Sequence, residues 1–135
     1  MLETVIKNTD DFVVSVPKTE RKKYGQFFTN GTTAAYMASL FNFDLSKPEI
    51  HILDAGAGTG ILSAAAVDRL VALGYKGKIL LTCYETDKRV LPVLEGNLDL
   101  LHCGLSIRCF AIIISLRRIL KGIHYSPCQI GYMIT

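Results

Sequence analysis

Apolar and polar positions form blocks along the first hundred residues, and these blocks predict strands and helices in turn. A short apolar run at 51–54 predicts a strand, and apolar residues at helical spacing over 61–73 predict a helix with Gly74 at its C-cap. Residues 78–85 predict a second strand, and residues 90–101 predict a second helix. This order makes a βαβ unit, which predicts an α/β protein with a parallel sheet.

Further elements flank this unit on both sides. Residues 32–41 predict a helix with Asn30 or Thr32 as its N-cap, and residues 107–115 form an apolar run that is typical of a buried strand. Before the upstream helix, residues 20–30 are charged and then aromatic. This composition indicates a loop over a pocket.

The glycine-rich turn between the first strand and its helix carries the most chemical information. Gly56, Gly58 and Gly60 allow a positive φ and let a ligand approach the main chain. Ile61 stands where a dinucleotide-binding G-x-G-x-x-G motif needs its last glycine, which disfavours NAD or FAD. The alternative interpretation is a turn that merely connects strand to helix.

Two acidic residues border this turn. Asp54 precedes it and can accept hydrogen bonds from an amino group, whereas Glu85 ends the next strand, where an acid can hold both hydroxyls of a ribose. Two anions at one edge would repel a pyrophosphate. The pattern therefore predicts a nucleoside ligand with a cationic or amino-bearing tail, unless both acids are merely solvated.

These segments resemble a known family. Residues 54–60, Asp-Ala-Gly-Ala-Gly-Thr-Gly, and 84–87, Tyr-Glu-Thr-Asp, resemble the first two motifs of S-adenosylmethionine-dependent methyltransferases with the Rossmann-like fold. Residues 23–29, Lys-Tyr-Gly-Gln-Phe-Phe-Thr, are similar to the N-terminal motif of adenine-N6 DNA methyltransferases of restriction–modification systems. This motif order is that of their gamma group, and the resemblance covers residues 18–101.

The resemblance implies roles for single residues. Phe27 and Thr29 would contact the methionine portion of S-adenosylmethionine, Asp54 its amino group and Glu85 its ribose. Asn30 stands where the family usually has proline, which loosens the loop without removing a contact. The cofactor-binding residues are therefore expected to be the following: Phe27, Thr29, Asp54, Gly56, Gly58, Gly60 and Glu85.

The motif that performs methyl transfer in these enzymes, Asn/Asp-Pro-Pro-Tyr/Phe, does not occur in this sequence. We therefore assign no catalytic residue and expect a truncated, partial Rossmann-like fold that alone does not methylate DNA. DNA would be the partner of the full-length enzyme, together with a missing C-terminal portion. The alternatives are a fragment of an RNA or protein-glutamine methyltransferase, or a non-catalytic nucleoside-binding remnant.

Three parts of the chain follow from these motifs. Residues 1–49 form the N-terminal arm and helix with the cofactor-covering motif, residues 50–101 form the βαβ S-adenosylmethionine-binding core, and residues 102–135 form an atypical tail. Residues 1–100 carry 11 Lys/Arg and 12 Asp/Glu, whereas residues 101–135 carry four basic residues and no acid. The net charge of +3 therefore comes from the tail.

This break in composition motivates the hypothesis that the tail is translated out of frame. Codons for 129–135 exist whose shifted reading spells Asn-Arg-Leu-Tyr-Asp-Tyr, which resembles the family's sequence just before its catalytic motif. The rival interpretation is a buried strand at 107–115 followed by basic turns. The gene sequence decides between the two.

Length and composition limit the class further. At 135 residues the chain suits one domain, and with 50% hydrophobic and 20% charged residues it is too apolar for disorder. It has no apolar run of membrane-spanning length, and residues 1–11 are too polar for a secretory signal, so we expect a cytoplasmic protein. The four cysteines form no C-x-x-C pair, which favours free thiols and no metal.

Overall fold

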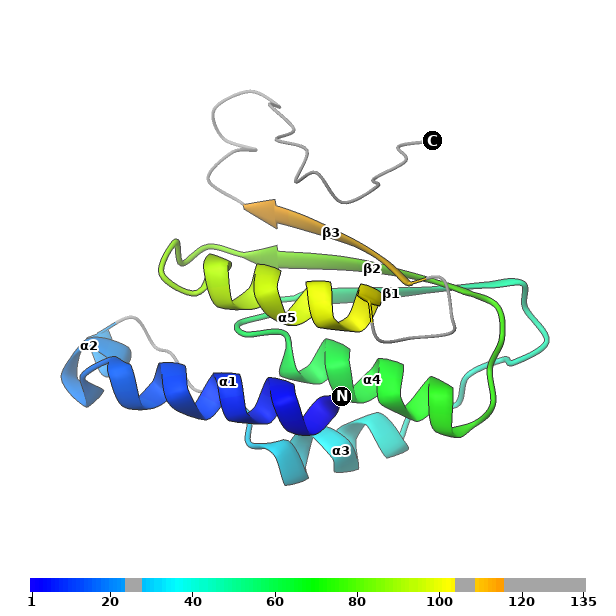
Figure 1. The fold of residues 1–135 in the computed structure, drawn as a ribbon, viewed down its shortest axis with the longest axis horizontal. Coiled ribbons are helices and arrows are strands. Elements are labelled where there is room, and N and C mark those ends of the chain that lie inside the picture. The colour runs from blue at the N-terminus through cyan, green and yellow to red at the C-terminus, as the bar shows by residue number, and fades with distance from the viewer. Residues whose placement is uncertain (24–27, 104–108, 116–135) are drawn as a thin grey trace.

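The computed structural model describes residues 1–23, 28–103 and 109–115, the last of these by backbone alone. Helices come first, and strands then alternate with helices (Figure 1). The elements in chain order are α1 (Leu2–Ser15), α2 (Lys18–Lys23), α3 (Gly31–Ser39), β1 (Glu49–Ala55), α4 (Ile61–Ala72), β2 (Lys78–Glu85), α5 (Leu91–Cys103) and β3 (Cys109–Ser115).

The three strands form one parallel sheet in the order β1-β2-β3. Asp54 pairs with Cys83 and Ala55 with Tyr84, so β1 and β2 end side by side. Because all three strands run the same way, Asp54 and Glu85 lie toward the same edge of the sheet. The predicted α/β class with a parallel βαβ core is confirmed, and the fold is Rossmann-like.

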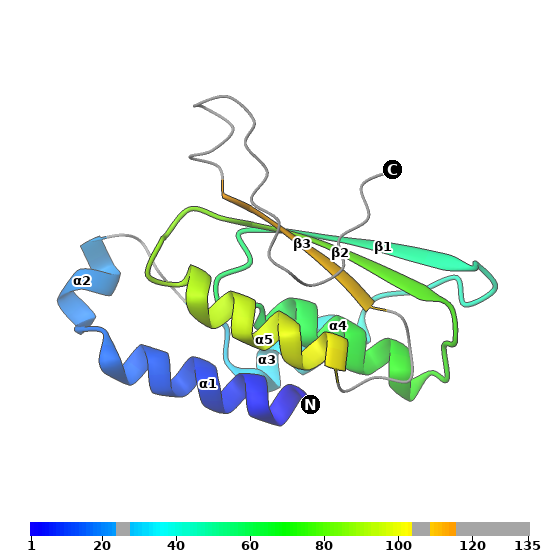
Figure 2. The ribbon, with the colours of Figure 1, turned by 45° about the horizontal axis from the view of Figure 1, so that its top comes forward.

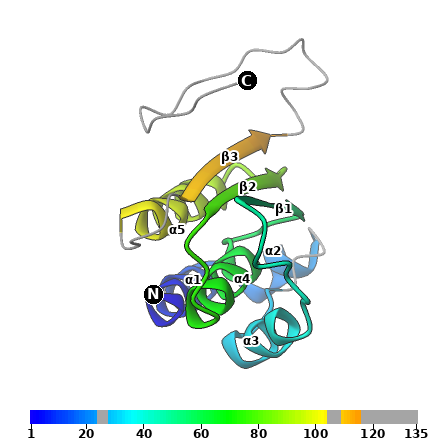
Figure 3. The ribbon, with the colours of Figure 1, turned by 90° about the vertical axis from the view of Figure 1, so that its right-hand side faces the viewer.

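The core lies between the sheet and the helices. Figure 3 shows α4 and α5 on the same side of the sheet. The side chains of β2 alternate, and Ile79, Leu81 and Cys83 are fully buried under these helices. Helix α4 carries a run of three buried alanines at 64–66, and these small side chains let the helix pack closely against its neighbours. In the described residues, the opposite face of β1 is open, and Leu53 there is 66% exposed.

The first helix, α1, is a correction to the sequence analysis, which treated these residues as an arm without predicting a helix. Val5 and Thr9, one helical turn apart, are its buried residues, and the helix packs against α4 and α5 (Figure 2). Apolar residues at positions 2, 5, 6, 12 and 13 recur at helical spacing, a signal that the sequence analysis missed, and the packing of this face stabilises the helix. Because Val5 shares one core cluster with residues of α4 and β2, the arm and the βαβ core pack together.

Helix ends follow the predicted signals. The Asn30 side chain accepts a 2.8 Å hydrogen bond from the Thr33 N–H and caps α3, which confirms Asn30 rather than Thr32. After α4, Gly74 has a φ of +76°, and the Tyr75 N–H donates to the Leu70 carbonyl at 3.0 Å. This arrangement is a Schellman motif, which requires a residue without a Cβ penalty at Gly74.

The remaining expectations concern the C-terminal tail, the cysteines, metal binding and membrane spans. β3 confirms an extended segment within 107–115, whereas residues 116–135 of the atypical tail lie outside the described residues. Cys83 is fully buried in the core. Within the described residues, no cluster of His, Cys, Asp or Glu suits a metal ion, and no helix is long and apolar enough to cross a membrane.

Candidate functional site

The glycine turn after β1 curls over the end of β2. The φ values of Gly56, Gly58 and Gly60 are +113°, +55° and +83°, so all three have the conformation for which glycine was expected. The N–H groups of Gly56 and Ala57 each donate to the Tyr84 carbonyl at 2.9 Å. These bonds hold the turn against the last residues of β2.

Glu85 connects the turn to the loop that follows β2. One carboxylate oxygen, Oε2, accepts a 2.9 Å bond from the Gly58 N–H. The other, Oε1, accepts bonds of 2.6 Å and 2.7 Å from the N–H groups of Thr86 and Asp87. A carboxylate offers about four lone-pair positions, so three N–H donors fix the orientation of Glu85 and leave room for a further donor on Oε2.

Asp54 is held by a residue that the sequence analysis did not single out. The Ser63 hydroxyl, on the first turn of α4, donates to Asp54 Oδ2 at 2.7 Å, and Ser63 is 1% exposed. Its oxygen also lies 3.6 Å from the buried Cys83 sulfur. The signal in the sequence was a single hydroxyl among the apolar residues that open this helix. A buried hydroxyl needs a partner, and here that partner is the predicted ligand-binding acid.

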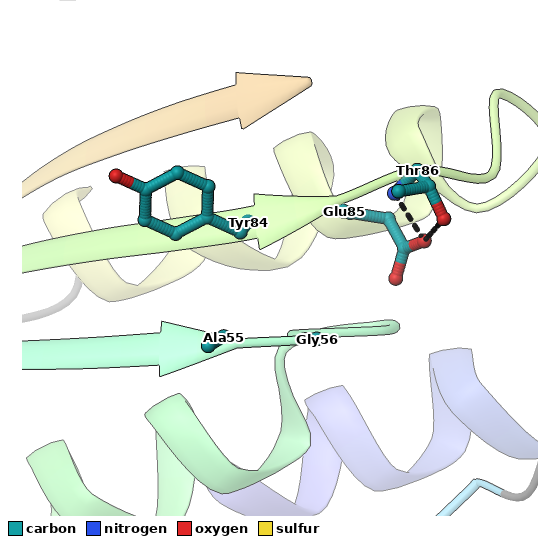
Figure 4. A pocket seen from close by; sticks show the side chains of 5 residues that line it. All are labelled: Ala55, Gly56, Tyr84, Glu85 and Thr86. Atoms are coloured by element: carbon teal, nitrogen blue, oxygen red, sulfur yellow. Dashed lines mark hydrogen bonds between the residues drawn. The ribbon is translucent and has the colours of Figure 1, made fainter. Parts of the chain in front are cut away.

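A hollow of about 330 Å³ opens at this edge of the sheet. It is lined by Ala55, Gly56, Tyr84, Glu85 and Thr86, and Figure 4 shows the Glu85 carboxylate pointing from the end of β2 toward the turn after β1. Small-molecule sites commonly begin near this volume. Gly56 and Glu85 are the predicted site residues that line it, and Ala55, Tyr84 and Thr86 are additions.

Among the described residues, no cation forms an ion pair with either of the two site acids, Asp54 and Glu85. Their hydrogen bonds come from backbone N–H groups and hydroxyls, which orient a carboxylate without neutralising it. The edge therefore keeps a negative potential.

The segment before α3 reaches the turn. A methyl group placed on Gly58 would lie 3.6 Å from ring carbons of Phe28, so this ring lies against the turn. Phe28 also meets Phe12 of α1 edge to face, with ring centroids 5.6 Å apart. Phe27 lies outside the described residues, and Thr29 is half-buried but does not line the hollow. Both remain predictions as cofactor contacts.

An ion-pair chain joins α2 to the loop after β2. Arg89 lies 2.9 Å from Glu20 of α2 and 2.7 Å from Asp87, two residues beyond Glu85. Figures 1 and 2 show α2 at the end of the molecule where the strands terminate. The Arg89–Glu20 pair is exposed, so it contributes only roughly 0–1 kcal/mol to the free energy of unfolding. Its main effect is to place α2 beside the loop after β2.

Two curated proteins are similar to this chain in sequence. Over 86 residues, 64% of the chain, it is 40% identical to the type II methyltransferase M.PstI of Providencia stuartii. Over 113 residues, 84% of the chain, it is 34% identical to the type II methyltransferase M.BsuBI of Bacillus subtilis. The chain spans 16% and 22% of these proteins, less than a quarter of either.

Protein-family models and solved structures were also compared with the chain. No protein-family model matches the chain. Among solved structures, MNMC2 from Aquifex aeolicus is similar with a TM-score of 0.39 and 18% identity, over 72% of this chain and 34% of that one.

Proposed function

This chain is a sequence relative of type II methyltransferases, and from that premise we propose that it binds S-adenosylmethionine at the carboxyl ends of β1 and β2. The observation that carries the proposal is the position of Glu85. Its carboxylate is oriented by three backbone N–H groups beside a hollow of about 330 Å³ and takes part in none of the described ion pairs. Ribose hydroxyls are suitable donors to such a group.

The charge of the site supports this ligand over a nucleotide. S-adenosylmethionine carries a sulfonium and an amino group, and both are attracted by the potential of Asp54 and Glu85. A pyrophosphate would meet two carboxylates that are paired with a cation in none of the described ion pairs. Asp54, held by Ser63, is the acid suited to the amino group of the methionine portion.

The same proposal extends to the reaction of the longer enzyme. The similarity of residues 23–29 to adenine-specific enzymes favours N6 of adenine in DNA as the methyl acceptor. This reaction requires a flipped base held in line with the sulfonium methyl. Because the sequence contains no Asn/Asp-Pro-Pro-Tyr/Phe motif, we expect this chain by itself to bind cofactor without transferring a methyl group to DNA. A cytoplasmic location in a restriction–modification system follows from the same role.

Calorimetric titration with S-adenosylmethionine tests the binding. Glu85→Gln replaces one acceptor oxygen by an amide and removes the charge, so affinity should fall about tenfold or more. Glu49→Gln is the matched control at the opposite end of the sheet, and its affinity should equal that of the unaltered chain. No binding by the unaltered chain, or equal binding by a folded Glu85→Gln variant, would overturn the assignment.

A chimera tests the link to DNA methylation. The aligned 86 residues of M.PstI are replaced by those of this chain, and methylated bases are identified by mass spectrometry of the treated DNA. We expect N6-methyladenine. A folded chimera that binds cofactor and transfers nothing contradicts the role of this chain in DNA methylation. Methylcytosine as the product contradicts the adenine assignment.

A further inference from the structure

The glycine turn rests on buried polar side chains from two helices that are distant in sequence. Thr59, between Gly58 and Gly60, is 1% exposed, and its partners Thr9 of α1 and Asn97 of α5 are 2% and 0% exposed. Buried polar groups are costly unless they are hydrogen-bonded. Each of these three residues forms a hydrogen bond that offsets the cost of burying its polar groups. These hydrogen bonds connect the turn to the two helices.

The hydrogen bonds have a direction that chemistry fixes. The Thr9 hydroxyl donates to the Val5 carbonyl at 2.7 Å. Because a hydroxyl has one hydrogen, the 2.8 Å bond between the Thr9 and Thr59 hydroxyls is donated by Thr59. On the other side, Asn97 Nδ2 donates to the Thr59 carbonyl at 2.8 Å, and Asn97 Oδ1 accepts from Asn8 Nδ2 at 2.7 Å. Helices α1 and α5 thus bind the same turn residue at two atoms.

We propose that Thr9 and Asn97 are positioning residues of the S-adenosylmethionine site, acting through Thr59 without touching the ligand. This inference rests on the proposed function. The turn belongs to no helix or strand ladder, so its position depends on the bonds of Gly56 and Ala57 to the Tyr84 carbonyl and, on the helix side, on the contacts of Thr59. Gly58, the preceding residue, donates its N–H to Glu85. A displaced Thr59 therefore displaces Gly58, one of the three N–H groups that orient Glu85 and the one bonded to Oε2.

A second contact of α1 reinforces the first. Phe12, three residues after Thr9, meets Phe28 edge to face, and the Phe28 ring lies against Gly58. Helix α1 therefore contacts the turn directly through the Thr9 hydroxyl and indirectly through the Phe12 ring, which packs on Phe28. An edge-to-face pair adds its own attraction to the buried area. Both contacts of α1 thus support the turn at Gly58 and Thr59.

Thr9→Val tests the inference, because valine keeps the shape of threonine and lacks its hydroxyl. We expect the affinity for S-adenosylmethionine to fall about tenfold and the Gly58 amide to exchange its hydrogen about tenfold faster, as for a lost buried hydrogen bond. The Leu81 amide, in the middle of β2, should keep its exchange rate. Thr9→Ser should restore both properties, and Ser15→Ala, an exposed change on the same helix, should alter neither.

The outcomes separate the inference from the proposed function. Unchanged affinity and unchanged Gly58 exchange in Thr9→Val overturn the inference, and so does equal acceleration at Gly58 and Leu81, because Thr9 then acts only on global stability. If the unaltered chain does not bind S-adenosylmethionine, the proposed function fails, and Gly58 exchange still decides whether Thr9 holds the turn. Should Thr9→Val fail to fold, Thr59→Val removes the same bond from the turn side.

Discussion

The acidic side chains at the two ends of β1 and β2 have different kinds of partners. At the amino end, Glu49 lies 2.6 Å from the Lys78 ammonium and also bonds His51. At the carboxyl end, the described hydrogen bonds of Asp54 and Glu85 come from backbone N–H groups and hydroxyls. One end neutralises its acid with a cation, whereas the other orients its acids and leaves their charge available.

This difference separates a structural cluster from a binding site. The Lys78 hydrogen bond, followed by that of His51, lowers the pKa of Glu49 below its usual 4.5, which is the effect of an acid already paired. A ligand gains little from such a group. A carboxylate fixed by uncharged donors has its orientation set in advance and its attraction for a cation intact. The carboxyl end is therefore the end suited to a sulfonium ligand.

The largest effect on stability is expected from a substitution in the glycine turn at the carboxyl end of β1. Gly60→Val forces a β-branched residue into a φ of +83° and brings a Cβ within 2.9 Å of the Leu94 side chain. Strain and overpacking together should lower the free energy of unfolding by about 2–3 kcal/mol. Urea denaturation measures the change. The same variant should bind S-adenosylmethionine poorly even where it remains folded.

Gly96→Ala is the matched control for this prediction. Gly96 lies within α5, and an added Cβ would meet nothing within 4 Å. Alanine in a helix interior is favoured over glycine, so this variant should be more stable by roughly 0.5–1 kcal/mol. A Gly60→Val protein as stable as the unaltered chain would show that the turn does not need its left-handed conformation.

The local part of this site could be predicted from the sequence. The positions of Gly56, Gly58 and Gly60 after a strand dictate a turn, and the strand length places Glu85 beside it, because parallel strands end at one edge. The Asn30 cap and the Gly74 C-cap are local signals as well. Each of these depends on neighbours in the chain, so one sequence is sufficient to find them.

The supports of the site could not be predicted. Thr9 and Thr59 are 50 positions apart, and their contact depends on how α1 packs against α4. Residues 2–15 have an amphipathic helical pattern that predicts the helix itself, yet the pattern does not indicate which element the helix packs against. Ser63 likewise gains meaning only when α4 brings its hydroxyl to Asp54. Contacts between distant elements require the fold.

A smaller effect is expected from Ser63→Ala, which removes a donor from Asp54 and leaves the backbone intact. A hydrogen bond to a charged group is worth roughly 1.5–3 kcal/mol, and part of it affects ligand binding through the orientation of Asp54, so we expect about a 3- to 10-fold loss of S-adenosylmethionine affinity. Ser39→Ala, an exposed serine that bonds only its own helix, is the control and should bind normally. If Ser63→Ala loses stability but keeps its affinity, the bond to Asp54 is structural alone.

The smallest effect should appear at the amino end, where Glu49→Gln removes a carboxylate that is already paired. Because the folded pKa of Glu49 is lowered, its contribution to stability is present above pH 4.5 and is lost as the pH falls through the folded pKa. The difference in free energy of unfolding between Glu49→Gln and the unaltered chain should therefore be largest near neutral pH and vanish in acid. Added salt should shrink it as well, since the pair is partly exposed. A difference that persists in acid and in high salt would mean that Glu49 stabilises the strands by something other than its charge, and the contrast between the two ends of the sheet would then lose its electrostatic basis.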